Sequence, residues 1–304
     1  MHRILRLSPF VAFLAAAILT RADVPAGEPS IVAKARAYLG AEEALNAVQS
    51  VHLVGRFVSD KTGAAPASTV DIIFQKPWQH HLVVTASQMI KIPGTIPTDD
   101  QKAGLAPMPE VRNTVVRTIA LNGYDAWERI QVNADTPRMG LLSVDQIRVL
   151  RADVWENLGY YRGIEAEGGH EEDQGPATID GVACEKVAFT HSPTVVYYRY
   201  FDQATGRLVY TETAGGLKIR EEGSIEASGI KFPQKITTIE PTATPDAPSR
   251  STTLTIDHVT VNEVFPSSLF AVPLPAVPVR PSDVPAAPAA AAPAPAASGP
   301  ISTP

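Results

Sequence analysis

The side chains best suited to covalent chemistry in this sequence are one cysteine and a few histidines. Cys184 is the only cysteine among the 304 residues. A nucleophile needs a base held beside it, yet no histidine lies near Cys184 in sequence and no Gly-x-Ser-x-Gly motif occurs. We therefore expect Cys184 to be a buried, unreactive thiol within a strand. We predict no catalytic residue and no enzymatic activity.

The histidines and acidic residues lack the spacing of metal ligands. His80 and His81 are adjacent, so on a strand their side chains point to opposite faces. His170, followed by Glu171–Asp173, does not have the helical His-Glu-x-x-His spacing. This acidic group is typical of a hydrated loop, with a weak cation site as the alternative. Gly215-Gly216 indicates a hairpin turn, because no strand-to-helix transition follows it. We expect no metal and no cofactor.

Composition limits the class of protein. The chain carries a formal net charge of −6 and 44% hydrophobic residues. Bulk electrostatics does not hold an acidic protein on nucleic acid or on an anionic membrane, so we predict no nucleic-acid partner. A single cysteine excludes an intramolecular disulfide, and the fold must be stabilised by its core. We expect a monomer.

The two ends differ from the middle of the chain. Two arginines precede the apolar run Leu7–Leu19, and Ala22 completes a small-residue cleavage site, which is the order of an export signal. We predict cleavage after Ala22 and a location in the periplasm, with a membrane anchor as the alternative. Pro273–Pro304 is dominated by proline and alanine, which predicts a disordered, extended spacer. Residues 23–272 remain as one domain.

Two segments have helical periodicity. Ser30–Gln49 places apolar residues on one face and has a weak point at Gly40. The second helix begins at Ser143, which forms a capping box with Gln146, and it ends at Gly159. One face of this second helix is apolar and consists of Ile147, Leu150, Val154 and Leu158.

The rest of the pattern is of short strands rich in β-branched and aromatic residues. Their short links exclude a parallel sheet. Asn122-Gly123 indicates a hairpin turn, whereas Ile92–Pro109 and Glu165–Pro176 are predicted as loops. The expected fold is mainly β (α+β), with one antiparallel sheet of about ten to eleven strands curled over two main helices. The predicted strands are Val51–Val58, Thr69–Gln75, His81–Thr85, Thr114–Leu121, Trp127–Val132, Val182–Thr190, Val195–Phe201, Leu208–Glu212, Leu217–Glu226, Ile230–Ile239 and Thr252–Val261.

Five short segments together resemble one known family. They are residues 38–57, the corner Phe74-Gln75-Lys76-Pro77-Trp78, Asn122–Trp127, Asp180–Cys184 and Tyr200–Leu208. They resemble the leading helix, strand corner, glycine turn and second-half strands of the bacterial outer-membrane lipoprotein-sorting proteins, which are built like the periplasmic carrier LolA. The resemblance implies a half-open barrel of antiparallel strands whose helices plug a hydrophobic cavity for acyl chains. The Pro/Ala-rich segment departs from the compact carriers of that family.

A curled sheet with an apolar concave face either fills that face with its own side chains or leaves room for a ligand. We predict a ligand cavity, and ordinary core packing is the alternative for each residue of its lining. We further expect the helix Ser143–Leu158 to be a movable plug. The candidate lining residues are Ile72, Phe74, Leu82, Val84, Ile119, Leu121, Trp127, Ile147, Leu150, Val154, Trp155, Val187, Phe189, Tyr198 and Tyr200.

Two functions from different classes fit these features. The first is a periplasmic carrier that holds lipid, or the acyl chains of lipoproteins, for transfer to the outer membrane. Its partners would include envelope proteins of the inner and outer membranes. The second is a non-shuttling interaction or sensor protein of the envelope that has the same fold and is tethered through its Pro/Ala-rich segment.

Overall fold

The computed structural model describes residues 29–59, 68–92, 94, 96–104, 106–242 and 250–273. The predicted export signal lies outside these ranges, as does the Pro/Ala-rich segment apart from Pro273, so both stay predictions. Within the described ranges, no helix has both the length and the apolar composition needed to cross a membrane.

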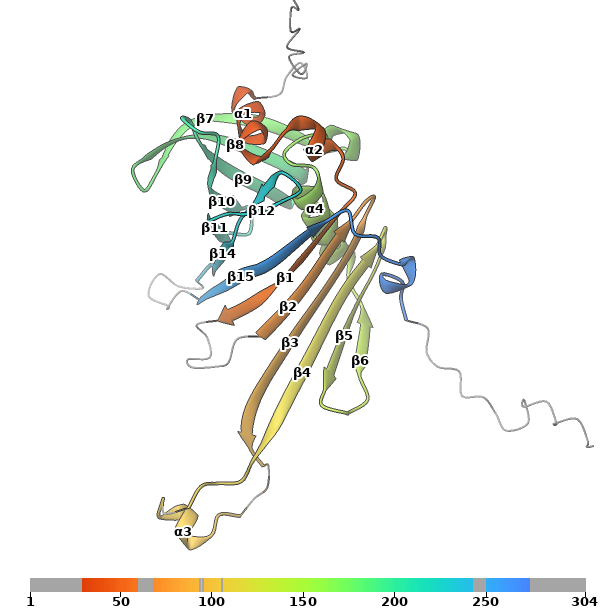
Figure 1. The fold of residues 1–304 in the computed structure, drawn as a ribbon, viewed down its shortest axis with the longest axis vertical. Coiled ribbons are helices and arrows are strands. Elements are labelled where there is room, and N and C mark those ends of the chain that lie inside the picture. The colour runs from red at the N-terminus through yellow and green to blue at the C-terminus, as the bar shows by residue number, and fades with distance from the viewer. Residues whose placement is uncertain are drawn as a thin grey trace, which may run out of the picture. The chain divides into compact units, whose positions relative to one another are not determined.

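The described residues form a mainly β fold, as predicted (Figure 1). The α-helices are α1 (Ser30–Leu39), α2 (Glu42–Asn46), α3 (Asp99–Lys102) and α4 (Val144–Leu158), and the short 3-10 helices are η2 (Ile164–Glu167) and η3 (Ser267–Leu269). The strands are β1 (Ser50–Ser59), β2 (Ser68–Gln75), β3 (Gln79–Lys91), β4 (Glu110–Asn122), β5 (Asp125–Val132), β6 (Arg138–Leu141), β7 (His170–Ile179), β8 (Val182–Ser192), β9 (Val195–Asp202), β10 (Leu208–Thr213), β11 (Lys218–Glu222), β12 (Ile225–Ala227), β13 (Ile230–Phe232), β14 (Lys235–Glu240) and β15 (Arg250–Val261).

The main sheet has 13 antiparallel strands in the order β6-β5-β4-β3-β2-β1-β15-β14-β11-β10-β9-β8-β7. It is open, with β6 and β7 as its two edges. The first strand of the chain and the last are therefore neighbours in its middle, with Val51 opposite Val261. The strands β12 and β13 form a separate hairpin. The prediction of a single antiparallel main sheet is confirmed, but the predicted count of about ten to eleven strands is too low.

Several strands were missed for physical reasons. The segment Glu165–Pro176, predicted as a loop, includes the last three residues of η2 and most of β7, whose acidic residues pair with β8. An edge strand needs no strongly apolar face, so its sequence has little strand signal. The short edge strand β6 is exposed throughout, so it too lacks an apolar face that would mark it in the sequence. The predicted strands Leu217–Glu226 and Ile230–Ile239 are each divided, because β12 and β13 turn away to pair with one another.

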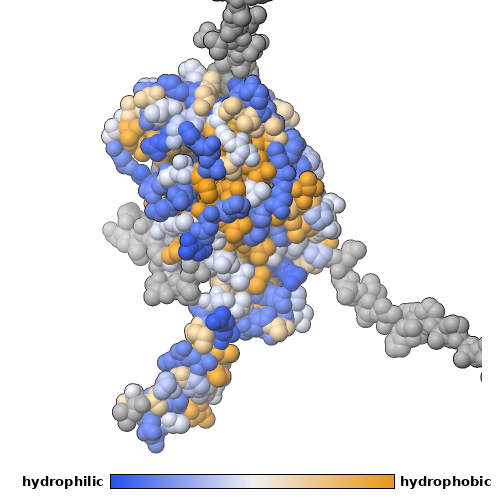
Figure 2. All heavy atoms as spheres, viewed as in Figure 1, coloured by the Kyte–Doolittle hydropathy of each residue, from blue (hydrophilic) through white to orange (hydrophobic). Residues whose placement is uncertain are grey.

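The hairpin of β3 and β4 is longer than predicted. Both strands run past their predicted ends, to Lys91 in β3 and from Glu110 in β4, which are the borders of the predicted loop Ile92–Pro109. Within that loop, Thr98 and Gln101 form a capping box that begins α3. Figure 1 shows this hairpin projecting from the rest of the sheet with α3 at its tip. Figure 2 shows both hydrophilic and hydrophobic residues on the surface of this hairpin, and Met89 and Val111 are among its exposed apolar side chains.

The leading helix divides at the predicted weak point. Gly40 separates α1 from α2 and forms an isolated bridge with Ile230 of β13. A Cβ atom at Gly40 would lie 2.7 Å from the carbonyl oxygen of Gly229. Only glycine therefore allows this close approach of the helix end to the β12–β13 hairpin.

The second helix follows its predicted boundaries. The Ser143 side chain accepts a hydrogen bond from the Gln146 backbone, and the Gln146 side chain accepts one from the Ser143 backbone. α4 packs on β1, β2, β3 and β4 and also contacts β9. It contributes Val154 and Leu158 to one buried apolar cluster, and Ala152 and Trp155 to a second. Burial of an aliphatic side chain of this size contributes about 1.5–3 kcal/mol, so α4 fastens both halves of the sheet.

Candidate functional site

A pocket of about 350 Å³ lies where α2, the end of α4 and the corner between β2 and β3 meet. We call it the Trp78 pocket. Its volume is at the lower end of the range for small-molecule sites, which is enough for one slender ligand. Its apolar walls and basic rim are made by Arg36, Leu45, Asn46, Lys76, Pro77, Trp78, Val154, Trp155, Leu158, Gly159, Arg162 and Glu167.

The corner Lys76–Trp78 is fixed by its backbone. The Lys76 amide donates to the carbonyl of Gln49 at 2.9 Å, and the Trp78 carbonyl accepts from the Gly123 amide at 2.8 Å. The Arg151 guanidinium from α4 lies 4.1 Å from the centre of the Trp78 ring, on its face. This cation–π contact holds one wall of the pocket against α4.

Arg36 forms the back of the pocket and is 2% exposed. One of its terminal nitrogens donates to the carbonyls of Gly159 at 3.1 Å and Tyr160 at 2.7 Å, just beyond the end of α4. Its other nitrogens donate to the Glu42 carboxylate at 3.0 and 2.8 Å. Because the carbonyls at a helix end need partners, Arg36 ties α1 and α2 to the end of α4.

Basic and acidic side chains around the pocket differ in number and in their partners. Burial opposes ionisation of Glu42, but hydrogen bonds and charge from Arg36, together with the charge of Arg162, outweigh it and lower the pKa of Glu42. Glu167 lies 3.7 Å from Arg151. Burial, together with the nearby charge of Arg36, lowers the pKa of Lys76. The basic side chains thus outnumber the acidic ones at this site.

A second pocket, of about 560 Å³, lies between α1 and the β12–β13 hairpin. Glycine, alanine and charged residues make most of its walls, with Tyr38 and Leu39 as the large apolar contributors. The Trp78 pocket is smaller but combines two tryptophans with aliphatic side chains. It is the better site for an apolar ligand.

Most predicted lining residues do lie on one face of the sheet. Register places Ile72, Leu82 and Ile119 opposite one another, and likewise Phe74 and Leu121 across His80. Val154 and Trp155 line the Trp78 pocket. The other candidates on this face pack into the core: Ile72, Phe74, Leu82, Val84, Leu121, Ile147 and Leu150 in the first cluster, and Val187 and Phe189 in the second.

Three predicted lining residues face the other side of the sheet. Tyr197 pairs with Phe189, so its neighbours Tyr198 and Tyr200 point the opposite way and pack near Cys184. Trp127 follows Ala126, which shares the inner face with Leu121, and its indole donates to the carbonyl of Phe270 at 3.2 Å. Side chains alternate between the two faces of a strand, so an error of one residue assigns a side chain to the wrong face. The alternation in the sequence alone did not show which set of residues points inward.

The structure contains a buried charged group that the sequence analysis missed. Glu156 on α4 accepts from His191 at 2.7 Å and pairs with Arg199 on β9. Tyr197 donates to Asp153 at 2.8 Å, and burial raises the pKa of Asp153 to about 6. These residues are distant in sequence and come together only because α4 packs across β9.

The residues considered for covalent or metal chemistry occupy structural positions. His80 stacks on Phe74, while His81 meets Phe270 on the other face of the sheet, as predicted for adjacent strand residues. Cys184 is buried, and burial raises the pKa of its thiol. Within the part of the chain that the structure describes, no group of three His, Cys, Asp or Glu side chains is placed to hold a metal ion.

Comparison with known proteins gives distant structural likenesses. No protein-family model matches the chain, and neither does any curated protein. A protein of the DUF1329 family from Desulfovibrio piger matches with 10% identity and a TM-score of 0.46, over 79% of this chain and 95% of that one. A putative outer membrane lipoprotein-sorting protein domain from Vibrio parahaemolyticus matches with 9% identity and a TM-score of 0.45, over the same shares. The lipoprotein LppX of Mycobacterium tuberculosis matches with 15% identity and a TM-score of 0.26, over 79% of this chain and 98% of LppX.

The second of these neighbours is described as a lipoprotein-sorting protein domain, and the sequence segments resemble that family. With 9 to 15% identity and TM-scores of 0.26 to 0.46, all three likenesses are remote.

Proposed function

We propose that this protein is a periplasmic binding protein that holds one acyl chain of a lipid or lipoprotein in the Trp78 pocket and carries it toward the outer membrane. The observation that supports this most is the pocket itself, whose walls join the rings of Trp78 and Trp155 to Leu45, Val154 and Leu158. An acyl chain that enters this space removes its apolar surface from water at about 25 cal/mol per Å².

Release requires that the pocket open. α4 supplies three of the apolar wall residues, and its first half is only partly buried. Movement of α4 away from the corner Lys76–Trp78 would open the pocket while the sheet stays intact. We therefore propose α4 as the movable plug of the carrier, with the Pro/Ala-rich segment acting as a spacer outside the domain.

The test is displacement of a neutral apolar fluorophore, N-phenyl-1-naphthylamine, by twelve-carbon amphiphiles. Asn46 is an exposed residue at the rim, and Asn46→Trp places a large ring over the opening. We expect this variant to weaken fluorophore binding about tenfold or more, because the space for the ligand is filled.

Glu43→Trp is the matched control, because Glu43 is also exposed on α2 but does not line the pocket. It should bind as the unmodified chain does, and thermal unfolding should show both variants folded. The proposal is wrong if the unmodified protein binds no fluorophore, or if Asn46→Trp binds it with full affinity. A protein that purifies without lipid and binds none would favour the non-shuttling interaction or sensor protein.

A further inference from the structure

The Lys76 ammonium is the feature of the Trp78 pocket that an acyl chain alone does not explain. Lys76 is half-buried at the pocket wall. Among the described residues, its ammonium group has neither an ion pair nor a hydrogen bond. A partly desolvated cation without a counter-ion is costly in an apolar pocket, so an arriving anion would be favoured there.

The acidic side chains around the pocket are already engaged. Glu42 accepts from Arg36 at 2.8 Å and from Arg162 at 2.5 Å. Glu167 lies beside Arg151, whose guanidinium is also stacked between the rings of Trp78 and Tyr124. Neither carboxylate is in contact with Lys76. The local charge therefore stays positive on the side of the pocket where Lys76 lies.

We propose that the ligand of the Trp78 pocket is a single-chain amphiphile with an anionic head group, a carboxylate or a phosphate, and that Lys76 binds this head group. The inference rests on the proposed acyl-chain function and adds the chemical class of the head. The chain would occupy the space between Trp155, Val154 and Leu158, and the anion would remain at the rim.

Geometry supports this division of the pocket. The corner Lys76–Trp78 is held by two backbone hydrogen bonds, so Lys76 is presented from a rigid position. Arg36 adds positive potential near Lys76 without being available, because its donors are committed to Glu42, Asn46 and the carbonyls of Gly159 and Tyr160. A charge-assisted hydrogen bond from a preorganised lysine is about twice as strong as a neutral one.

The experiment compares dodecanoate and dodecyl phosphate with dodecanol as competitors for N-phenyl-1-naphthylamine, with inorganic phosphate as a fourth competitor. In the unmodified protein we expect both anionic amphiphiles to bind about tenfold more tightly than the alcohol. Lys76→Gln should remove this preference and leave the affinity for dodecanol unchanged. Lys76→Arg, which keeps the charge, should restore most of it.

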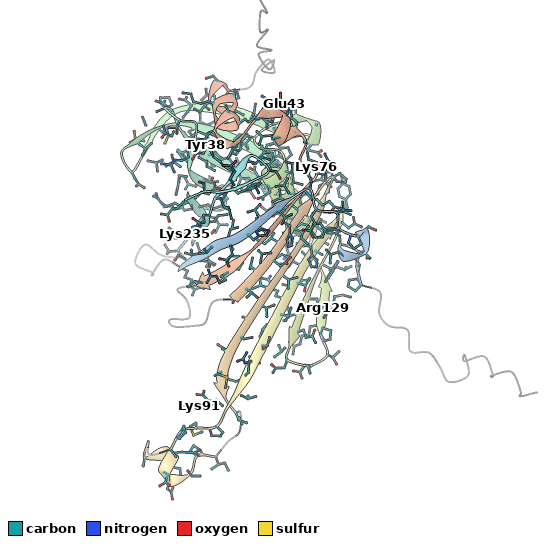
Figure 3. The ribbon with its side chains drawn as sticks, in the orientation of Figure 1. Tyr38, Glu43, Lys76, Lys91, Arg129 and Lys235 are labelled. Carbon is teal, nitrogen blue, oxygen red and sulfur yellow. The ribbon has the colours of Figure 1, made fainter. Side chains whose placement is uncertain are left out.

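Lys91→Gln is the matched control. Lys91 lies at the far end of β3, distant from the pocket, and Figure 3 labels both lysines. This variant changes the net charge by the same amount and should keep the preference for anions. If Lys76→Gln and Lys91→Gln act alike, the effect is one of net charge and the inference is wrong.

The outcomes separate the two proposals. Equal affinity for dodecanoate and dodecanol in the unmodified protein overturns the head-group inference, while the acyl-chain function stands. Displacement by none of the twelve-carbon compounds overturns both. Competition by inorganic phosphate as strong as that by dodecyl phosphate would show a free-anion site and overturn the amphiphile assignment.

Discussion

At the scale of single residues, the two buried basic side chains Arg36 and His80 behave differently. The donors of Arg36 are used on Glu42 and on the carbonyls beyond α4. His80 stacks on Phe74, but its Nδ1 atom is buried and has no hydrogen-bond partner among the described residues. Burial, and then the nearby His81, lower the pKa of His80 to about 4. A buried neutral histidine makes stability depend on pH.

We expect His80 to destabilise the protein as the pH falls. Its pKa is about 4 in the folded state and near the ordinary 6.5 when unfolded, so the unfolded chain binds more protons between these values. The free energy of unfolding therefore rises with pH between about 4 and 6.5, by on the order of 3 kcal/mol. Asp153 has the opposite sign, because its raised folded pKa of about 6 makes stability fall as the pH rises toward 6.

Urea unfolding of His80→Gln at several pH values isolates the histidine contribution. The difference in unfolding free energy between the unmodified chain and His80→Gln should increase with pH across this window. The exposed His258, changed to Gln, serves as the control and should leave the difference flat. A constant difference for His80→Gln would show that His80 is not held neutral by burial.

At the scale of elements, α4 fastens the two halves of the sheet and is also the proposed plug of the pocket. These two roles conflict in part, because the first needs tight packing and the second needs movement. Its second half is buried and supplies Val154, Trp155 and Leu158 to the core and to the Trp78 pocket. Its first half is packed less tightly, with Ile147 and Leu150 only half-buried and Val149 exposed. Loosening of α4 can therefore start at its first turn, and it must reach Val154 and Trp155 before the Trp78 pocket opens.

Truncation of the half-buried apolar side chains should loosen α4. We expect Ile147→Ala and Leu150→Ala each to cost about 1–2 kcal/mol, less than for fully buried side chains. Amide hydrogen exchange in residues 144–152 should accelerate, and affinity for N-phenyl-1-naphthylamine should change. Val149→Ala, on the exposed side, should alter neither. Unchanged fluorophore binding in both Ile147→Ala and Leu150→Ala would rule out α4 as the plug.

At the scale of the whole domain, the sheet joins the first and last parts of the described chain. β15 pairs with both β1 and β14, and the residues after it return to the outer face of the sheet. There Phe270 is fully buried against Trp127 and His81. Glu263 also accepts a hydrogen bond from the Ser50 hydroxyl at 2.6 Å. Residues 262–272 are thus part of the fold.

Truncation should show that residues 262–272 stabilise the fold and that the Pro/Ala-rich segment does not. We expect a chain that ends at Val261 to melt about 10 °C lower than the full chain, because loss of a buried Phe alone costs about 3–5 kcal/mol. A chain that ends at Pro273 keeps η3 and Phe270, and its melting temperature should match that of the full chain. Phe270→Ala should reproduce most of the loss, even if the shorter chain fails to fold. Equal melting of all forms would contradict this account.

Local patterns in the sequence determined much of the architecture. The capping box at Ser143 fixed the start of α4, because its hydrogen bonds join residues three apart. Gly40 marked the division of the leading helix, and alternation identified most central strands, because each such strand buries one face. The edge strands β6 and β7 were not predicted, because no apolar face marks them in the sequence. Trp127, Tyr198 and Tyr200 were assigned to the wrong face, because phase depends on the partner strand.

The Trp78 pocket is the feature that only the tertiary structure decided. Lys76, Pro77 and Trp78 were recognised in the sequence as a strand corner, and Val154 and Trp155 as apolar helix residues. Nothing local brings Arg36 and Leu45 to the same place. That convergence comes from packing of α1 and α2 against the end of α4, where Arg36 binds the carbonyls of Gly159 and Tyr160. The sequence alone determined an apolar face with helices over it. The cavity, and with it the place of Lys76 in its wall, depends on contacts between residues more than a hundred positions apart along the chain, and no periodicity records such contacts.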